Sequence, residues 1–262
     1  MAIPRLIHQT ARSFNELPDE IKSNFSKIKD LNPGWEWRFY DDNEVADYIR
    51  RNLGKTYDHL YERLNKGYGV VMADIFRYLV IFNEGGVYLD AKSTMTWPLD
   101  RVLHPDVSYV LSQWADNGPG EPFAGWGCTP DLHRIPKGEL QQWHVIAEPG
   151  HPFLREVLRQ VEFNIEHYHP RWFGIGELAV HRLTGPICYT LAIAPMLPFH
   201  PCHLVDIRSL GFFYSIYEHA LQHRRDAGNA HYSQGTLPIL ADRSTRSESP
   251  ETRWFSAKQG VQ

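Results

Sequence analysis

The residues with the clearest capacity for chemistry lie in the apolar stretch from Tyr68 to Asn83. Its only charged residues are Asp74 and Arg77, three positions apart and therefore on the same face of a helix. Burying two charges costs on the order of several kcal/mol for each ion before they attract one another. The pair either pins the helix as a structural ion pair or lines a pocket in which a ligand's hydroxyls meet a carboxylate and a guanidinium. Taken alone, the pair leaves both interpretations open.

A pair of glycines follows this stretch and changes the balance between the two interpretations. Gly85 and Gly86 predict the end of the helix, and a very short strand then delivers Tyr88, Asp90 and Lys92 at its carboxyl end. Ligands of α/β proteins bind at that edge of the sheet. Because paired glycines allow a tight reversal and a close approach of the backbone, we expect the helix face and the strand end to line one cavity.

The elements that must position these residues alternate along the chain. Helical spacing of apolar residues, a proline start at Pro18 and capping by Asp41 and Asp42 predict helices after the first two strands. We expect strands at 5–10, 35–40, 87–89, 107–114 and 143–147, and later helices at 69–83, 153–168 and 185–194. This alternation is typical of an α/β fold.

The domain organisation is expected to be simple. We predict one domain over residues 1–240 and a polar tail over 241–262, where the sequence becomes rich in serine and charge. A loop rich in Gly and Pro, from about residue 117 to 138, joins two of the predicted strands. Long loops of this kind in compact domains are usually functional.

Composition and charge exclude several classes of protein. A net charge of -4 gives no general attraction to nucleic acid. No run of apolar residues reaches the roughly 18 needed to span a membrane, and the start lacks a signal-peptide core, so a cytoplasmic location is expected. The three cysteines are far apart and are interpreted as core thiols. Aromatic residues make up 13%, which weakly favours sugar binding because sugar rings stack on such side chains.

Together, the helix with Asp74 and Arg77, the glycine pair and the strand ending in Asp90 resemble the glycosyltransferases with a DXD sugar-binding region. The stretches IPRLIHQT, NPGWEWRFYDD, HPFL and TGP also resemble that family, over roughly residues 3 to 235. The resemblance implies a single GT-A-like α/β domain, a Rossmann-like nucleotide-diphospho-sugar transferase with a mixed central sheet. It also implies transfer of a hexose or N-acetylhexosamine from a UDP- or GDP-sugar to a glycan hydroxyl, with retention of configuration, in polysaccharide or glycoconjugate synthesis.

The resemblance assigns roles to individual residues on the donor side. It implies that Asp74 and Arg77 hold the donor sugar and act in catalysis, and that Asp90 contacts the ribose or the metal shell. The remaining donor residues that it implies are Ile7, His8, Gln9, Gly85, Gly86, Tyr88 and His231. His231 corresponds to a C-terminal residue that closes over the diphosphate; a lone histidine is more often a satisfied polar group.

The triplet Asp90-Ala91-Lys92 departs from the family's pattern, because its last position normally carries the carboxylate that binds Mg²⁺ or Mn²⁺. A lysine stabilises a leaving diphosphate directly, and it also weakens cation binding by removing a ligand and adding a repulsive charge. We therefore expect weak or absent metal dependence. The alternative is that Lys92 turns outward while Asp90 and His231 still hold a metal.

The acceptor side is less well defined. Aromatic and acidic residues in or near the Gly/Pro-rich loop could stack on an acceptor glycan or glycolipid and receive a hydroxyl: Trp114, Asp116, Glu121, Trp126, Asp131, Trp143 and His144. The tail after Arg243 could contact a membrane-bound acceptor lipid, which would place the chain at the inner face of a membrane. The competing class is a catalytically inactive glycan- or nucleotide-sugar-binding protein of the same fold.

Overall fold

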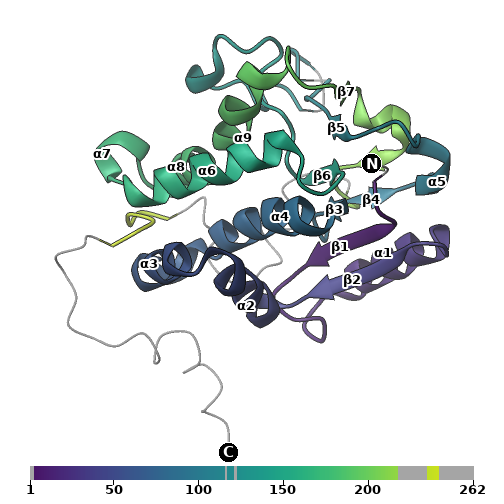
Figure 1. Cartoon of the computed structure of the whole chain (residues 1–262), viewed down its shortest axis with the longest axis horizontal. Helices are drawn as coiled ribbons and strands as arrows, with labels where there is room; N and C mark the ends of the chain where they lie inside the picture. The colour runs from purple at the N-terminus through teal and green to yellow at the C-terminus, as the bar shows by residue number, and fades with distance from the viewer. Residues whose placement is uncertain (1–2, 116, 121–122, 218–234, 242–262) are drawn as a thin grey trace, which may run out of the picture.

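The computed structural model describes residues 3–115, 117–120, 123–217 and 235–241 (Figure 1). Its strands are β1 (Leu6–Thr10), β2 (Glu36–Tyr40), β3 (Gly86–Leu89), β4 (Thr94–Met95), β5 (Tyr109–Leu111), β6 (His144–Ala147), β7 (His203–Leu204) and β8 (Phe212–Phe213). Its α-helices are α1 (Asp19–Leu31), α2 (Asp42–Leu53), α3 (Lys55–Arg63), α4 (Val70–Glu84), α5 (Leu99–Val102), α6 (Pro152–Glu166), α7 (Pro170–Phe173), α8 (Gly176–Leu183) and α9 (Pro186–Ile193). Short 3-10 turns lie at Lys66–Tyr68, Pro130–Leu132, Ala194–Met196 and Ile207–Leu210.

The central sheet is mixed, as predicted. Its strand order is β2-β1-β3-β6-β5-β7, and β6 runs antiparallel to both of its neighbours. Strand β1 pairs in parallel with β2 and β3, so the carboxyl ends of these three strands meet at one edge. A separate antiparallel pair joins β4 to β8.

Two hydrophobic cores lie on opposite faces of this sheet. Helices α2, α3, α4, α6, α8 and α9 cover one face, and α4 and α6 lie side by side in Figure 1. The other core is built on Ile28 of α1, Leu99 of α5 and the region around β4 and β8. The sheet edge that carries Asp90 therefore lies between a helical layer and a smaller, aromatic-rich layer.

Helix α4 is central because ten of its residues are buried, from Val71 to Ile81. It ends where Gly85 and Gly86 adopt φ of 71° and 100°. A Cβ on Gly86 would lie 2.6 Å from the carbonyl oxygen of Leu6, so only glycine lets β3 pack this closely beside β1. The glycine pair thus positions the strand that ends at Asp90.

Helix α2 begins as its sequence predicts. The Asp41 side chain accepts hydrogen bonds from the backbone amides of Asn43 and Glu44, and Glu44 bonds back to the amide of Asp41. The strand expected at 107–114 is shorter than predicted, at Tyr109–Leu111, because Val107 closes a turn onto His104 and Gln113 forms only an isolated bridge with Leu140.

Candidate functional site

Asp74 and Arg77 form the centre of a buried charged cluster. Their residues are 1% and 5% exposed, and the guanidinium Nη2 of Arg77 lies 3.4 Å from Asp74 Oδ1 and 3.1 Å from Asp90 Oδ1. One guanidinium therefore bridges a carboxylate of helix α4 and a carboxylate at the end of strand β3. The helix face and the strand end are therefore in contact, and the cavity that they were expected to line stays a prediction.

Neutral polar groups complete this cluster. Thr184 Oγ1 donates to Asp74 Oδ2 at 2.9 Å, the Gln142 amide donates to Asp74 Oδ1 at 3.2 Å, and Arg77 Nη1 donates to the Gln142 carbonyl at 3.0 Å. The Tyr78 hydroxyl lies against both Gln142 and Thr184. The carboxylate of Asp74 is held from three directions before any ligand arrives.

The electrostatics keep the guanidinium charged. Burial alone would lower the pKa of Arg77, but the neighbouring Asp90 and Asp74 carboxylates raise it above its usual value. Burial raises the pKa of Asp74, and the Arg77 charge and the Thr184 hydrogen bond oppose that rise. The Arg77 Nε atom is buried without a hydrogen-bond partner. Such an arrangement is typical of a polar ligand pocket, although structural ion-pair networks also shift pKa values.

Lys92 lies in the turn that follows β3, and its side chain has different neighbours from that of Asp90. Ser93 N donates to the Asp90 carbonyl at 2.9 Å, and the Asn24 amide of α1 donates to the Ser93 carbonyl at 2.8 Å, which fixes the loop. The Lys92 ammonium donates to the Tyr214 hydroxyl at 2.6 Å and lies 4.1 Å from the centre of its ring. Asp90 thus faces Arg77, whereas Lys92 faces the aromatic layer.

The triplet Asp90-Ala91-Lys92 supplies one carboxylate, because Lys92 stands at its last position. Asp90 Oδ1 contacts the Arg77 guanidinium and also accepts a hydrogen bond from the Tyr88 hydroxyl at 3.3 Å. The last position of the motif, where the family carries a second carboxylate, is occupied by Lys92. No group of three or more His, Cys, Asp or Glu side chains with metal-binding geometry occurs in the part of the chain that the structure describes. His231, predicted to close over the diphosphate or to bind metal, lies outside the described residues.

The three residues of β1 that were predicted to line the donor pocket are buried. Ile7 packs in the core with 0% exposure, and His8 is held by the Tyr40 hydroxyl and the Gly85 carbonyl, each at 3.1 Å. Burial lowers the pKa of His8 to about 4, so its ring is neutral. Gln9 accepts from the Trp37 indole at 2.9 Å, and its amide nitrogen is buried without a partner. Of the three, only Gln9 keeps an unused polar group beside the carboxyl edge of the sheet.

Three of the predicted acceptor residues, Trp114, Trp126 and Trp143, lie in a cluster of aromatic rings. Trp114 and Trp126 lie 5.0 Å apart with Phe123 and Tyr214 around them, while Trp143 packs 5.9 Å from Tyr214. This cluster of Trp114, Phe123, Trp126, Trp143 and Tyr214 is called the aromatic cluster below.

Two of the predicted acceptor residues, His144 and Asp131, have partners within the protein. His144 is 1% exposed, its Nε2 pairs with Ser112 at 2.8 Å, and burial lowers its pKa to about 3. Asp131 forms a bidentate ion pair with Arg182 at 2.9 and 3.1 Å. Asp116 and Glu121 lie outside the described residues.

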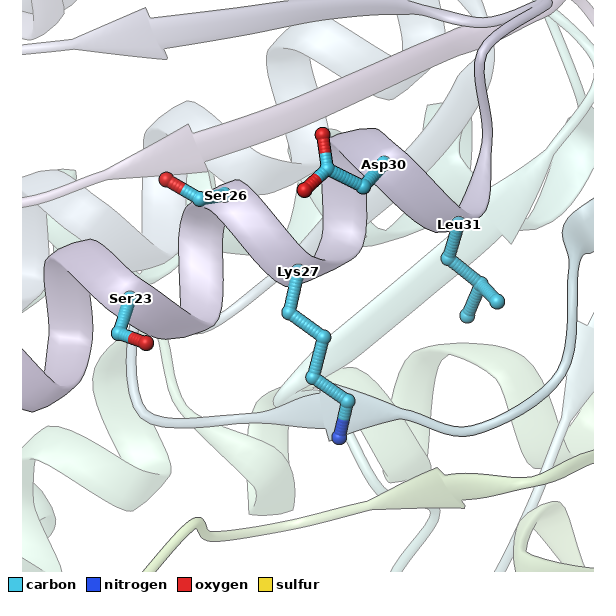
Figure 2. A pocket seen from close by; sticks show the side chains of 5 residues that line it. All are labelled: Ser23, Ser26, Lys27, Asp30 and Leu31. Carbon is cyan, nitrogen blue, oxygen red and sulfur yellow. The ribbon is translucent and has the colours of Figure 1, made fainter.

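A hollow of about 490 Å³ lies along the outer face of α1, lined by Ser23, Ser26, Lys27, Asp30 and Leu31 (Figure 2). None of these side chains belongs to the charged cluster or to the aromatic cluster. The opposite face of α1 is the one that matters for the site, because Asn24 lies there and binds the loop of Lys92.

Some site residues were not predicted from the sequence. Gln142, Tyr78 and Tyr214 carry no motif of their own, and their partners are distant in sequence. Thr184 belongs to the TGP stretch, and a polar residue just before a helix is a signal that could have identified it. Glu139 is a further example: its carboxylate accepts from the Trp114 indole at 2.6 Å.

The comparisons with known proteins cover the region that contains this site. Residues 18–109 match the family model described as the glycosyltransferase sugar-binding region containing a DXD motif. The chain is 25% identical to inositol phosphoceramide mannosyltransferase 3 of Schizosaccharomyces pombe over 88% of this chain and 59% of that protein. It is 26% identical to the initiation-specific alpha-1,6-mannosyltransferase of the same organism over 74% of this chain and 49% of that protein. The chain thus spans about half the length of these curated relatives.

Two solved structures share the fold. The PaToxG glycosyltransferase superposes with a TM-score of 0.54 at 14% identity, covering 75% of this chain and 71% of that one. The ligand-free glycosyltransferase domain of the YGT toxin superposes with a TM-score of 0.51 at 10% identity, covering 83% and 82%.

Within the residues that the structure describes, no helix has the length and apolar character needed to cross a membrane. The buried Asp74–Arg77–Asp90 cluster falls inside the matched region, at the sheet edge where α/β proteins bind ligands. Residues 18–109 thus resemble the sugar-binding region of glycosyltransferases that contain a DXD motif, and the fold resembles that of two solved glycosyltransferase structures.

Proposed function

We propose that the chain transfers a hexosyl group from a nucleotide-diphosphate sugar to a hydroxyl of a glycan or glycolipid. The observation that carries this proposal is the buried guanidinium of Arg77 between two carboxylates, inside the matched sugar-binding region. A sugar hydroxyl is both donor and acceptor, so this arrangement of fixed acceptors and donors suits it. The relatives named as mannosyltransferases make mannose the first sugar to test.

The proposed role of each residue follows from its position in the site. Asp74 and Arg77 orient the hexose, and Asp90 contacts the ribose or a sugar hydroxyl from the end of β3. Lys92, on the other side of the turn, stabilises the negative charge that the leaving diphosphate gains. Retention of anomeric configuration, as in the family that the sequence resembles, is part of the proposal.

We also propose that the reaction depends weakly or not at all on a divalent metal. The shared use of Asp90 by Arg77 and Tyr88, together with Lys92 at the motif's last position, supports this. The measurement is donor hydrolysis in excess chelator. Loss of activity in chelator that Mn²⁺ restores would oppose it.

The acceptor is proposed to be a glycan or a glycolipid. Relatives whose names specify inositol phosphoceramide make a lipid-linked acceptor a candidate. Such an acceptor would bring the chain to a membrane surface, and the cytoplasmic face is the location we propose. The globular domain is proposed to end near residue 240, since Ile239 and Leu240 are buried and Ile239 bonds to Asn65.

The test is a panel of UDP- and GDP-sugars, with GDP-mannose first, scored for slow hydrolysis without acceptor and for nucleotide binding by thermal shift. Hydrolysis that is abolished in Asp74→Asn, in a protein that still melts cooperatively, supports the proposal. Binding of nucleotide sugars without turnover would favour the rival function, an inactive nucleotide-sugar-binding protein. The exposed variant Asp30→Asn serves as the matched control and is expected to retain activity.

A further inference from the structure

Glu139 occupies a specifically built position in the loop between β5 and β6. Its backbone amide donates to the Gly127 carbonyl at 3.0 Å. Gly127 has φ of 73°, and a Cβ there would lie 2.6 Å from the Glu139 Cγ and 2.8 Å from the Trp114 ring. A Cβ on Gly138 would overlap the carbonyl of Gly127. The two glycines therefore allow the two sides of the loop to approach and bring Glu139 against Trp114.

The carboxylate of Glu139 has only a neutral donor. Oε1 accepts from the Trp114 indole at 2.6 Å, and among the residues that the structure describes Glu139 contacts no cation and its Oε2 has no hydrogen-bond partner. Burial raises the pKa of Glu139 to about 7, and the Trp114 hydrogen bond opposes that rise. A carboxylate in such surroundings destabilises the folded chain when ionised, which is typical of groups retained for a ligand.

An aromatic surface adjoins this carboxylate. Trp114 packs 4.8 Å from Phe123, 5.0 Å from Trp126 and 5.3 Å from Tyr214, and the last three residues are only partly buried. Tyr214 holds the Lys92 ammonium. An apolar ring surface beside an open carboxylate oxygen fits a sugar ring, which has an apolar face and an equatorial rim of hydroxyls.

The same short segment reaches the donor side. Glu139 and Gln142 belong to the stretch 139–142, and Gln142 bonds to both Asp74 and Arg77. Residues on one side of this stretch therefore face the proposed donor sugar, while Glu139 faces the aromatic cluster. A second ring bound at Glu139 would lie next to the donor groups, where an acceptor is needed.

We propose that Glu139 and the ring of Trp126 bind the acceptor, a polyhydroxylated six-membered ring of the pyranose or cyclitol class. Adjacent hydroxyls of that ring donate to Glu139 Oε2, and its apolar face lies on Trp126. This inference rests on the proposed transferase function. It adds a residue and a ligand class on the acceptor side.

The test separates donor hydrolysis from transfer. With the donor that the wild-type protein hydrolyses, myo-inositol and methyl α-mannopyranoside serve as acceptor probes for wild type, Glu139→Gln and Trp126→Ala. We expect the acceptor KM to rise about tenfold or more in both variants, because a hydrogen bond to a charged group or a ring contact is lost. Hydrolysis without acceptor should stay within about twofold, since neither side chain contacts the donor groups. Glu162→Gln and Trp172→Ala, both at exposed positions of α6 and α7, are matched controls and should leave both activities unchanged.

Two results would overturn the proposal. One is an unchanged acceptor KM in Glu139→Gln, and the other is an equal loss of hydrolysis and transfer, which would indicate a structural role. Calorimetric titration of the same two probes, in wild type and Glu139→Gln, needs no turnover. If no donor is hydrolysed, the transferase proposal fails, and the titration still decides the binding site: binding lost in the variant supports it, and equal binding in both or binding in neither opposes it.

Discussion

The two sides of the turn at residues 90–92 differ in how their charged groups are held. On the α4 side, Arg77 lies between two carboxylates, and Asp74 receives bonds from Thr184 and Gln142. On the other side, Lys92 and Glu139 rest against the aromatic rings of Tyr214 and Trp114. The first arrangement joins charged groups to one another, whereas the second sets charged groups against aromatic rings. Rigid charged groups suit orientation of a sugar, and aromatic supports suit a charge that acts on the departing or incoming group.

The largest effect is expected from removing the cation of the rigid side. Arg77→Ala leaves Asp74 and Asp90 without their shared partner, so the free energy of unfolding should fall by about 3–5 kcal/mol. Urea denaturation measures it. Arg208→Ala, which breaks an exposed pair with Asp206, is the control and should cost about 1 kcal/mol or less. A loss at Arg77 as small as that control would mean that the rigid side is not fixed by this ion pair.

The second effect concerns how the stability of the fold depends on pH. Because burial lowers the pKa of His8 from 6.5 to about 4, the unfolded chain binds a proton below pH 6.5 that folded His8 does not accept until about pH 4. Stability should therefore be full above pH 6.5 and fall as the pH drops toward 4, by about 3 kcal/mol for this residue.

The measurement is urea denaturation across that pH range in wild type and His8→Asn. The variant should show a shallower decline, while the exposed His133→Asn should follow the wild type. Identical slopes in wild type and His8→Asn would contradict a neutral His8 between Tyr40 and Gly85.

Substitutions on the aromatic side should lower the rate of donor hydrolysis more than the stability of the fold. Lys92→Ala is expected to lower kcat for donor hydrolysis about 100-fold, since one preorganised charge on the diphosphate is removed. The loss should be the same with and without chelator. A Lys92→Ala protein that regains activity with Mn²⁺ would place the diphosphate charge on a metal.

The smallest effect tests the support of Lys92. Tyr214→Phe keeps the ring and removes the hydroxyl that accepts from the ammonium, so kcat should fall about fivefold. In the double variant with Lys92→Ala, this loss should disappear, because Tyr214 acts through Lys92. Additive losses would indicate that Tyr214 has an independent role.

The sequence predicted the parts of the site that depend on local pattern. Asp74 and Arg77 stood out because an apolar helix contained no other charge over their stretch, and the glycine pair marked the turn into β3. Tyr214 could not be predicted, since β4 and β8 are two residues long and their pairing joins Met95 to Phe212 without any periodic signal. Helix α8 was also missed: it begins at a glycine and is short, yet it leads to Thr184 beneath Asp74.

The segment that follows β8 supports the motif loop through contacts that are distant in sequence. Ile216 N donates to the Lys92 carbonyl at 2.8 Å, and Ser93 Oγ donates to the Tyr214 carbonyl at 3.0 Å. The second contact joins residues 121 positions apart, and a long loop costs more entropy to close than a short one. A nascent chain that has emerged only as far as β6 would hold Asp74, Arg77 and Asp90 but not the partner of Lys92. A chain truncated there would also lack Thr184, so Asp74 and Lys92 would each be without a hydrogen-bond partner that the folded domain provides.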